Sequence, residues 1–183
     1  MDTVELEITT MAHGGSGIAR LDGRVVFCPG VIPGEVVKAQ LVETSKKSLW
    51  RAEALSIITP SPHRRPHIWA EADISRDPDN RAGGADYGHI ELGHQRELKT
   101  GILRDSLQRF GGLGGDIIEQ IDVAGLPGDD DANGLGWRTR VNLHANGEGV
   151  LGPFAERSHT VIPVNSLPLA SAAIRDSGVL GTT

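Results

Sequence analysis

The side chains of this sequence that are best suited to chemistry are cations, and they occur in three short groups. These groups are Lys46-Lys47-x-x-x-Arg51, Arg64-Arg65 and Arg138-x-Arg140. Clustered ammonium and guanidinium groups bind phosphate. The whole chain carries a net charge of −6, but residues 1–66 hold eight Lys/Arg and seven Asp/Glu. Screening leaves only charges within about 10 Å effective, so a local basic patch can bind a polyanion although the molecule is acidic.

Nucleophilic and metal chemistry have little support in the sequence. Cys28 is the only thiol, which excludes an internal disulfide and any multi-cysteine metal site, and we expect a small buried residue there. Asp129-x-Asp131-x-Asn133 copies the opening of a calcium loop, but the twelfth position is Arg140 instead of a bidentate Glu. The closely spaced histidines signal no further ligands; they are His63/His67 and His89/His94. No metal site is predicted.

The basic groups follow or interrupt a series of short strands. Gly17–Leu21 and Arg24–Cys28 flank Asp22-Gly23, and Asp-Gly between alternating strands is a strong hairpin signal. Further strands are predicted at Val4–Ile8, Glu35–Leu41 and Trp50–Ile58. Five short strands in under 60 residues are typical of a small Greek-key barrel of the OB type.

The rest of the chain is predicted to be mixed. Apolar spacing over Ile90–Phe110 predicts a helix that Gly111-Gly112 ends. The other expected elements are a short strand at Asp116–Val123, a hairpin of Trp137–Asn146 with Val150–Phe154, an extended piece at His159–Val164 and a helix starting at Leu167–Ile174. The predicted fold class is mainly β with α+β: a five-stranded OB-like barrel over residues 1–60, a linker over 61–66, and an incomplete α+β central domain over 67–183.

The order AHGGSGIARLDGRVVFCPGVIPGE, followed by a basic stretch, resembles a TRAM domain, the RNA-binding barrel of several RNA-modifying enzymes. The segment Ala82–Lys99 (AGGADYGHIELGHQRELK) and the later Trp137-Arg138-Thr139-Arg140 resemble the S-adenosylmethionine-dependent RNA (uracil-5-)-methyltransferases of tRNA and rRNA. The resemblance spans roughly residues 3–175. It implies an RNA-recognition portion of an enzyme that methylates C5 of a uridine, with structured rRNA or tRNA as partner.

Ten residues are candidates for RNA contact. They are Gly14, Gly15, Gly17, Lys46, Lys47, Arg51, Arg64, Arg65, Arg138 and Arg140. The alternatives are plain structural ones: glycines needed for positive φ, a solvated loop around Lys46, a hydrated linker at Arg64-Arg65, and an ion pair of Arg138 or Arg140 with the Asp129–Asp131 loop. Trp50 is interpreted as a core or edge aromatic, ahead of a stacking platform.

The sequence departs from the family in two ways. Many members hold a [4Fe–4S] cluster on four thiolates, and the matching positions here are Ala82, Ala85 and Leu167, so we expect no cluster. The domain that binds S-adenosylmethionine and supplies the attacking cysteine and a base is not found; Gly111-Gly112-x-Gly114-Gly115 follows a helix where that motif needs a strand. No catalytic residue is predicted, and the cofactor is expected only in the full-length protein.

Two other functions compete with this interpretation. One is a stand-alone TRAM-type RNA-binding module without enzymatic activity, and the other is an interaction protein that does not bind RNA, since residues 67–183 carry a net charge of −7. No apolar run reaches the length of a membrane span and the acidic start is unlike a signal peptide, so a cytoplasmic location is expected. Neither membrane nor DNA is an expected partner.

Overall fold

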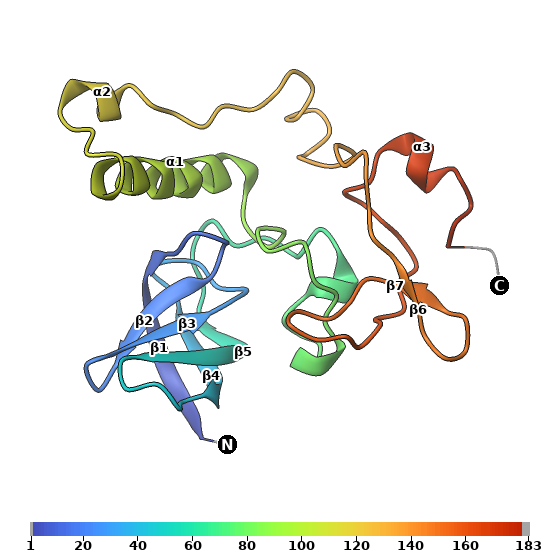
Figure 1. Cartoon of the computed structure of the whole chain (residues 1–183), viewed down its shortest axis with the longest axis horizontal. Coiled ribbons are helices and arrows are strands. Elements are labelled where there is room, and N and C mark those ends of the chain that lie inside the picture. Colours follow the sequence, from blue (N-terminus) through green and yellow to red (C-terminus); the bar gives the residue numbers. More distant parts are fainter. Residues whose placement is uncertain (1, 181–183) are drawn as a thin grey trace.

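The computed structural model describes residues 2–180, which form a closed β-barrel followed by one long helix and a largely irregular region (Figure 1). The barrel strands are β1 (Thr3–Met11), β2 (Gly17–Leu21), β3 (Arg24–Cys28), β4 (Val36–Glu43) and β5 (Leu49–Thr59). Their order is β1-β2-β3-β5-β4, with β4 back beside β1 and only β3 and β5 parallel. The predicted five-stranded OB-like barrel is confirmed.

The hairpin of β2 and β3 has the turn that the sequence predicts. Asp22 and Gly23 have φ angles of 49° and 77°, and a type I′ turn needs positive φ at both central positions. Alternate side chains of the strands point inward, so Leu6, Ile8 and Val26 are buried in the barrel core.

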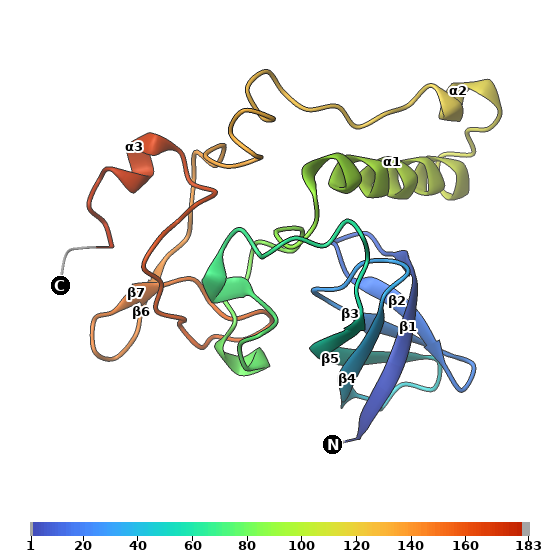
Figure 2. The ribbon, with the colours of Figure 1, turned by 180° about the vertical axis from the view of Figure 1, so that it is seen from behind.

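Helix α1 (Leu92–Arg109) lies across one end of the barrel in both views (Figures 1 and 2). Leu98 and Ile102 of α1 pack with buried Met11 and Ile32 from the barrel. The helix predicted over residues 90–110 is therefore confirmed. None of the helices within residues 2–180 is long and apolar enough to cross a bilayer.

A buried ion pair joins the barrel to the chain that follows it. The Glu35 side chain is fully buried, and its carboxylate accepts hydrogen bonds from Arg64 Nε (2.6 Å) and Nη2 (2.7 Å) and from the backbone N–H groups of Ile32 (2.8 Å) and Ser61 (3.1 Å). Arg64 also donates to the carbonyl of Gly30 at 2.9 Å. Residues 61–66, which composition suggests to be a linker, are thus fixed to the barrel.

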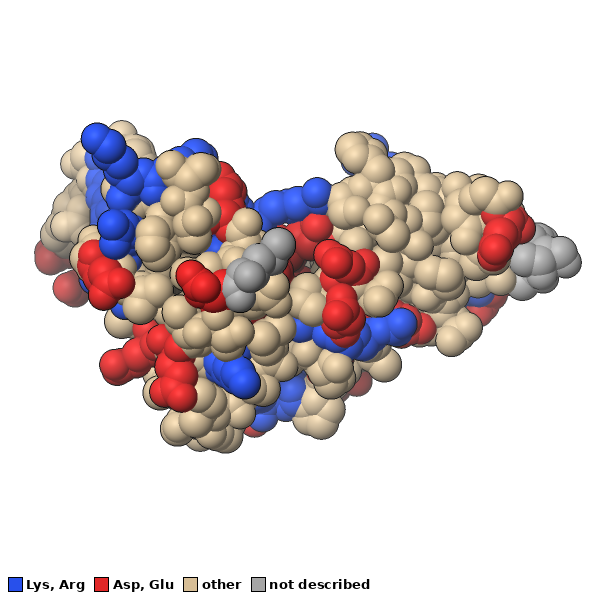
Figure 3. All heavy atoms as spheres, turned by 90° about the horizontal axis from the view of Figure 1, so that it is seen from below, with Lys and Arg blue, Asp and Glu red and all other residues tan. Residues whose placement is uncertain are grey.

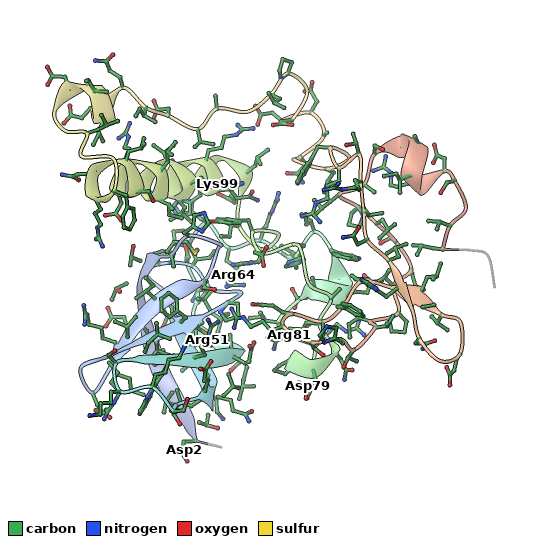
Figure 4. The ribbon with its side chains drawn as sticks, viewed as in Figure 1. Asp2, Arg51, Arg64, Asp79, Arg81 and Lys99 are labelled. Atoms are coloured by element: carbon green, nitrogen blue, oxygen red, sulfur yellow. The ribbon has the colours of Figure 1, made fainter. Side chains whose placement is uncertain are left out.

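Arg81 makes a second connection between the two parts. Its guanidinium donates to the carbonyls of Ala54 in β5, Ile74 and Arg76, each within 2.9 Å. Figure 4 shows Arg64 and Arg81 on the side of the barrel that faces the rest of the chain. Burial lowers the pKa of the Arg81 guanidinium, and the nearby carboxylate of Glu53 opposes this shift.

The remaining elements are short. They are the 3₁₀ helices η1 (Ala70–Ala72) and η2 (Pro78–Asn80), α2 (Asp116–Glu119), β6 (His144–Ala145), β7 (Leu151–Gly152) and α3 (Ala172–Arg175). A second apolar cluster, which includes Trp69, Ile162 and Leu169, holds this region together.

Three predictions for this region are wrong. Asp116–Val123 contains the short helix α2 instead of a strand, because the Arg104 guanidinium binds the carbonyls of Glu119 and Ile121 and folds the chain back toward α1. The predicted strand Trp137–Asn146 is reduced to β6, because the backbone at Arg138 bonds to Leu169 and Ser171 instead. The helix expected from Leu167 begins only at Ala172.

Candidate nucleic-acid interface

The strand register divides the predicted RNA-binding residues between opposite ends of the barrel. Gly17 pairs with Cys28 at one end of β2, and Leu21 pairs with Arg24 at the other. Val25 pairs with Leu49, which places the β4–β5 loop with Lys46 and Lys47 beside the β2–β3 turn. The glycines at 14–17 therefore lie at the α1 end of the barrel, away from these lysines.

The end of the barrel with the β4–β5 loop carries four cations around one aromatic ring. We call this set the barrel-end cluster: Arg24, Lys46, Lys47, Arg51 and Trp50. Lys46 and Lys47 are exposed, and Arg51 is half-buried. Glu43 partly neutralises the group through ion pairs with Arg51 (3.2 Å) and Lys46 (3.8 Å). Figure 3 accordingly shows basic and acidic side chains interspersed on the face seen from below.

Trp50 is an edge aromatic, as the sequence predicts. It packs partly against the barrel core, and its indole Nε1 donates to the carbonyl of Lys46 at 3.0 Å. The guanidinium Cζ of Arg24 lies 4.6 Å from the centre of the indole ring. Sequence reasoning missed Arg24, because only the parallel pairing of β3 with β5 brings it beside this loop.

The structure explains why glycine occupies the positions just before β2 and at its first residue. Gly17 is buried, and a Cβ there would overlap the side chain of Val31. Gly15 is also buried, has a φ of 85°, and leaves no room beside Tyr87. Other parts of the protein occupy the space beside these two glycines, which favours the structural alternative, and their contact with RNA stays a prediction. Only Gly14 is exposed with open space around its Cα.

Arg64 has a structural partner in the barrel. Its side chain is 15% exposed and binds the buried carboxylate of Glu35, so little of the guanidinium is open to RNA or to solvent, and its contact with RNA stays a prediction. Its neighbour Arg65 points to the α1 side of the barrel, where Nη1 donates to Asn133 Oδ1 at 2.6 Å. Arg65 remains a candidate for RNA contact.

Arg138 and Arg140 do not share a strand face. Arg138 is half-buried and its Nη2 donates to the carbonyl of Gly84 at 2.5 Å, while Arg140 is exposed. Neither forms the predicted alternative ion pair with the Asp129–Asp131 loop within the described residues; Arg96 pairs with Asp130 instead, at 2.9 Å. Both arginines therefore remain candidates for RNA contact.

The positions that correspond to iron ligands in the family meet in one place. Ala82, Ala85 and Leu167 are all less than 10% exposed and belong to the second apolar cluster. Their methyl and isobutyl groups offer iron no donor atom, so the residues present do not fit a [4Fe–4S] cluster. Apolar packing joins the segments here.

We therefore predict that the purified protein is colourless. Iron and acid-labile sulfide, measured by colorimetric assay after anaerobic purification, should be far below one equivalent. The same assay on a known iron–sulfur protein serves as the positive control. Stoichiometric iron and sulfide with visible absorption would contradict the apolar role of Ala82, Ala85 and Leu167.

Cys28 is inert in this fold, as predicted for a small buried residue. Its side chain is fully buried in the barrel core, and burial raises the pKa of the thiol to about 12. The thiolate is the nucleophilic form, so almost none of this thiol is reactive near neutral pH.

Alkylation should reveal this burial directly. We predict that iodoacetamide leaves Cys28 unmodified in the native protein at neutral pH, and that it labels one thiol per chain in urea. Mass spectrometry measures both. Rapid labelling of the native protein would show that the barrel opens at β3.

Two histidines with neutral imidazole rings lie between the barrel and the loop that follows it. His89 is 2% exposed, and burial together with nearby Arg64 lowers the pKa of its imidazole to about 3. The backbone N–H of Trp69 donates to His67 Nδ1 at 3.0 Å, so Nε2 carries the proton that faces the Ala85 carbonyl at 3.2 Å. Burial lowers the pKa of His67 as well.

These histidines make stability depend on pH. Between pH 6.5 and about 3 the unfolded chain binds a proton at residue 89 that the folded protein excludes, so stability falls as the pH falls. We predict that His89 alone lowers the free energy of unfolding by about 2 kcal/mol from pH 7 to pH 5, measured by urea titration. His89→Gln should remove this part of the slope, and exposed His13→Gln should keep it. Equal slopes for wild type and His89→Gln would refute the assignment.

Comparison with known proteins agrees with the barrel fold described above. The family model described as the TRAM domain matches residues 2–55. The chain is 33% identical over 183 residues to an uncharacterized RNA methyltransferase of Streptomyces coelicolor, covering 96% of this chain and 38% of that protein. It is 35% identical over 154 residues to an uncharacterized RNA methyltransferase of Corynebacterium glutamicum, covering 82% of this chain and 33% of the relative.

A third relative has a more specific name. The 23S rRNA (uracil(1939)-C(5))-methyltransferase RlmD of a Shewanella species is 33% identical over 175 residues, covering 90% of this chain and 34% of that protein. A solution structure of a conserved Methanococcus maripaludis protein matches 30% of this chain and 77% of its own at 36% identity, with a TM-score of 0.28. The chain thus spans less than two fifths of the length of these curated relatives. From its TRAM barrel and these relatives, the chain belongs to the family of TRAM-domain RNA methyltransferases.

Proposed function

We propose that this chain is the RNA-recognition portion of an S-adenosylmethionine-dependent methyltransferase that acts on C5 of a uridine in rRNA or tRNA. The observation that carries the proposal is a closed TRAM barrel that bears clustered cations and an aromatic ring at one end. The relative named for the uracil C5 of 23S rRNA supports the choice of base.

In this proposal the barrel-end cluster binds the sugar–phosphate backbone. Lys46 and Lys47 extend from an exposed loop, and Arg51 can exchange Glu43 for phosphate, because an ion pair at a solvent-accessible position contributes little free energy. Contacts of this kind must also offset the few kcal/mol that unstacking a target base costs.

The methyl-transfer chemistry is assigned to a part of the protein outside residues 2–180. S-adenosylmethionine supplies the methyl group in such enzymes, but the residues here do not fit it: the glycines at 111–115 end α1, with positive φ at Gly112 and Gly115, and follow no strand. Cys28 is sealed in the barrel and cannot attack a base. We accordingly propose a division into an RNA-binding barrel (1–60), a connection (61–66) and a partial central domain (67–183).

Salt-dependent RNA binding tests the proposal. A fluorescently labelled, structured rRNA fragment and a tRNA would be titrated with the protein by anisotropy, between about 50 and 200 mM salt. Release of counterions from three or four phosphates should weaken binding by at least about tenfold over this range. Absence of binding, or affinity insensitive to salt, would contradict RNA recognition and favour a role in protein interaction.

A further inference from the structure

A basic groove lies at the α1 end of the barrel, away from the barrel-end cluster. It encloses about 360 Å³ between α1, the loop at residues 84–88 and the chain near Trp137. We call it the α1 groove and define it by the four cations and two aromatic residues on its wall: Arg65, Tyr87, Arg96, Lys99, Trp137 and Arg138. Two acidic residues, Asp86 and Asp129, also line it, so its wall has a net positive charge in an acidic protein.

The cations of the α1 groove are only partly neutralised. Arg65 Nε is buried and lacks a hydrogen-bond partner within the part of the chain that the structure describes. Arg96 pairs with Asp130, whose side chain is 77% exposed. Lys99 extends from α1 (Figure 4), and its ammonium lies 4.8 Å from the centre of the Tyr87 ring. Burial and the neighbouring Arg96 lower the pKa of Lys99, so a bound anion would relieve repulsion there.

An exposed indole completes the wall. Trp137 is 56% exposed, although tryptophan is usually largely buried. The Arg138 Cζ lies 5.0 Å from the centre of the indole ring, and its bond to the Gly84 carbonyl holds the guanidinium in place. An exposed ring beside fixed cations is the arrangement that binds single-stranded nucleic acid, because bases stack on the ring while the cations follow the phosphates.

We propose that the α1 groove binds an unpaired segment of the RNA, with one base stacked on Trp137 and adjacent phosphates on Arg65, Lys99 and Arg138. The inference rests on the proposed function in taking RNA as the ligand, and adds a second contact of a different kind. The barrel-end cluster then holds a structured part of the RNA, while the α1 groove holds an unpaired strand at the other end of the barrel.

The test uses the full chain and labelled hexauridylate as an unpaired RNA. Trp137→Ala should weaken binding of hexauridylate by about tenfold, and Trp137→Phe, which keeps a ring, should stay within about threefold of wild type. Phe110→Ala is the matched control, because Phe110 is an 89% exposed aromatic outside the groove. Lys99→Gln should lower the slope of log K against log salt by about 0.7.

Four outcomes decide between this inference and the proposed function. Loss of hexauridylate binding in Trp137→Ala, with normal binding in Phe110→Ala, supports the groove. If Trp137→Ala binds hexauridylate like wild type while structured RNA still binds, the inference that the α1 groove binds unpaired RNA is wrong and the proposed function stands. If the wild-type protein binds neither RNA, the groove inference and the proposed function are both wrong. If hexaglutamate displaces hexauridylate at equal concentration, the groove recognises acidic peptide and the RNA assignment fails.

Discussion

Glu35→Ala should lower the free energy of unfolding by about 3–5 kcal/mol, as expected when one partner of a buried ion pair is removed. The substitution leaves the Arg64 guanidinium facing a cavity at 15% exposure, and it deprives the N–H groups of Ile32 and Ser61 of their acceptor. Each loss adds an unsatisfied polar group in a site that water cannot easily reach. Urea titration followed by circular dichroism measures the effect.

Two further variants separate the ion pair from general damage. Glu7→Ala, at an exposed position of β1, should change stability by less than about 0.5 kcal/mol. The double variant Glu35→Met/Arg64→Met should recover much of the loss, because replacing both partners leaves no buried charge unpaired. A double variant as unstable as Glu35→Ala would mean that the backbone bonds to Glu35, and not the charge pair, dominate.

Replacing Lys46, Lys47 and Arg51 together by alanine should weaken binding of structured RNA by about tenfold or more. Each lost phosphate contact lowers the slope of log K against log salt by about 0.9, so the slope should fall by about 2 to 3 units. All three side chains belong to the barrel-end cluster, and none contributes to the barrel core. Anisotropy titration gives the affinity, and an unchanged unfolding midpoint shows that the barrel stays folded.

Glu43→Gln provides a control of opposite sign. It removes the carboxylate that pairs with Arg51 and Lys46, and so it should strengthen RNA binding by several-fold at low salt. An exposed carboxylate outside the cluster, Glu148→Gln, should have no effect. Weaker binding by Glu43→Gln would show that Glu43 positions the cations instead of competing with RNA.

The barrel could be predicted from the sequence because its signals are local. Asp22-Gly23 specifies its own turn, and the period-2 alternation of Arg24–Cys28 selects one buried face. The strand boundaries agree to within a few residues, from Thr3 to Thr59. Helix α1 could be predicted for the same reason, since its apolar spacing and the glycines that end it lie within its own segment.

The candidate site could be predicted only in part, because partners far along the chain decide it. From the sequence alone, Arg64 is expected to be a surface cation. In the fold it pairs with buried Glu35, which lies 29 residues earlier in the chain. Trp137–Arg140 reads as a strand until the segment at residues 169–171 takes its backbone bonds. Arg24 becomes part of the barrel-end cluster only through the parallel pairing of β3 and β5. No local pattern in the sequence carries these contacts.

The most direct test of RNA recognition by this barrel is amide-shift mapping by NMR. Isotope-labelled protein of 19.4 kDa would be titrated with an unlabelled structured RNA at low salt. We expect perturbations concentrated at residues 43–51 and around Arg24, with a second group near Trp137. Perturbations confined to other surfaces, or none at saturating RNA, would contradict RNA recognition by the barrel.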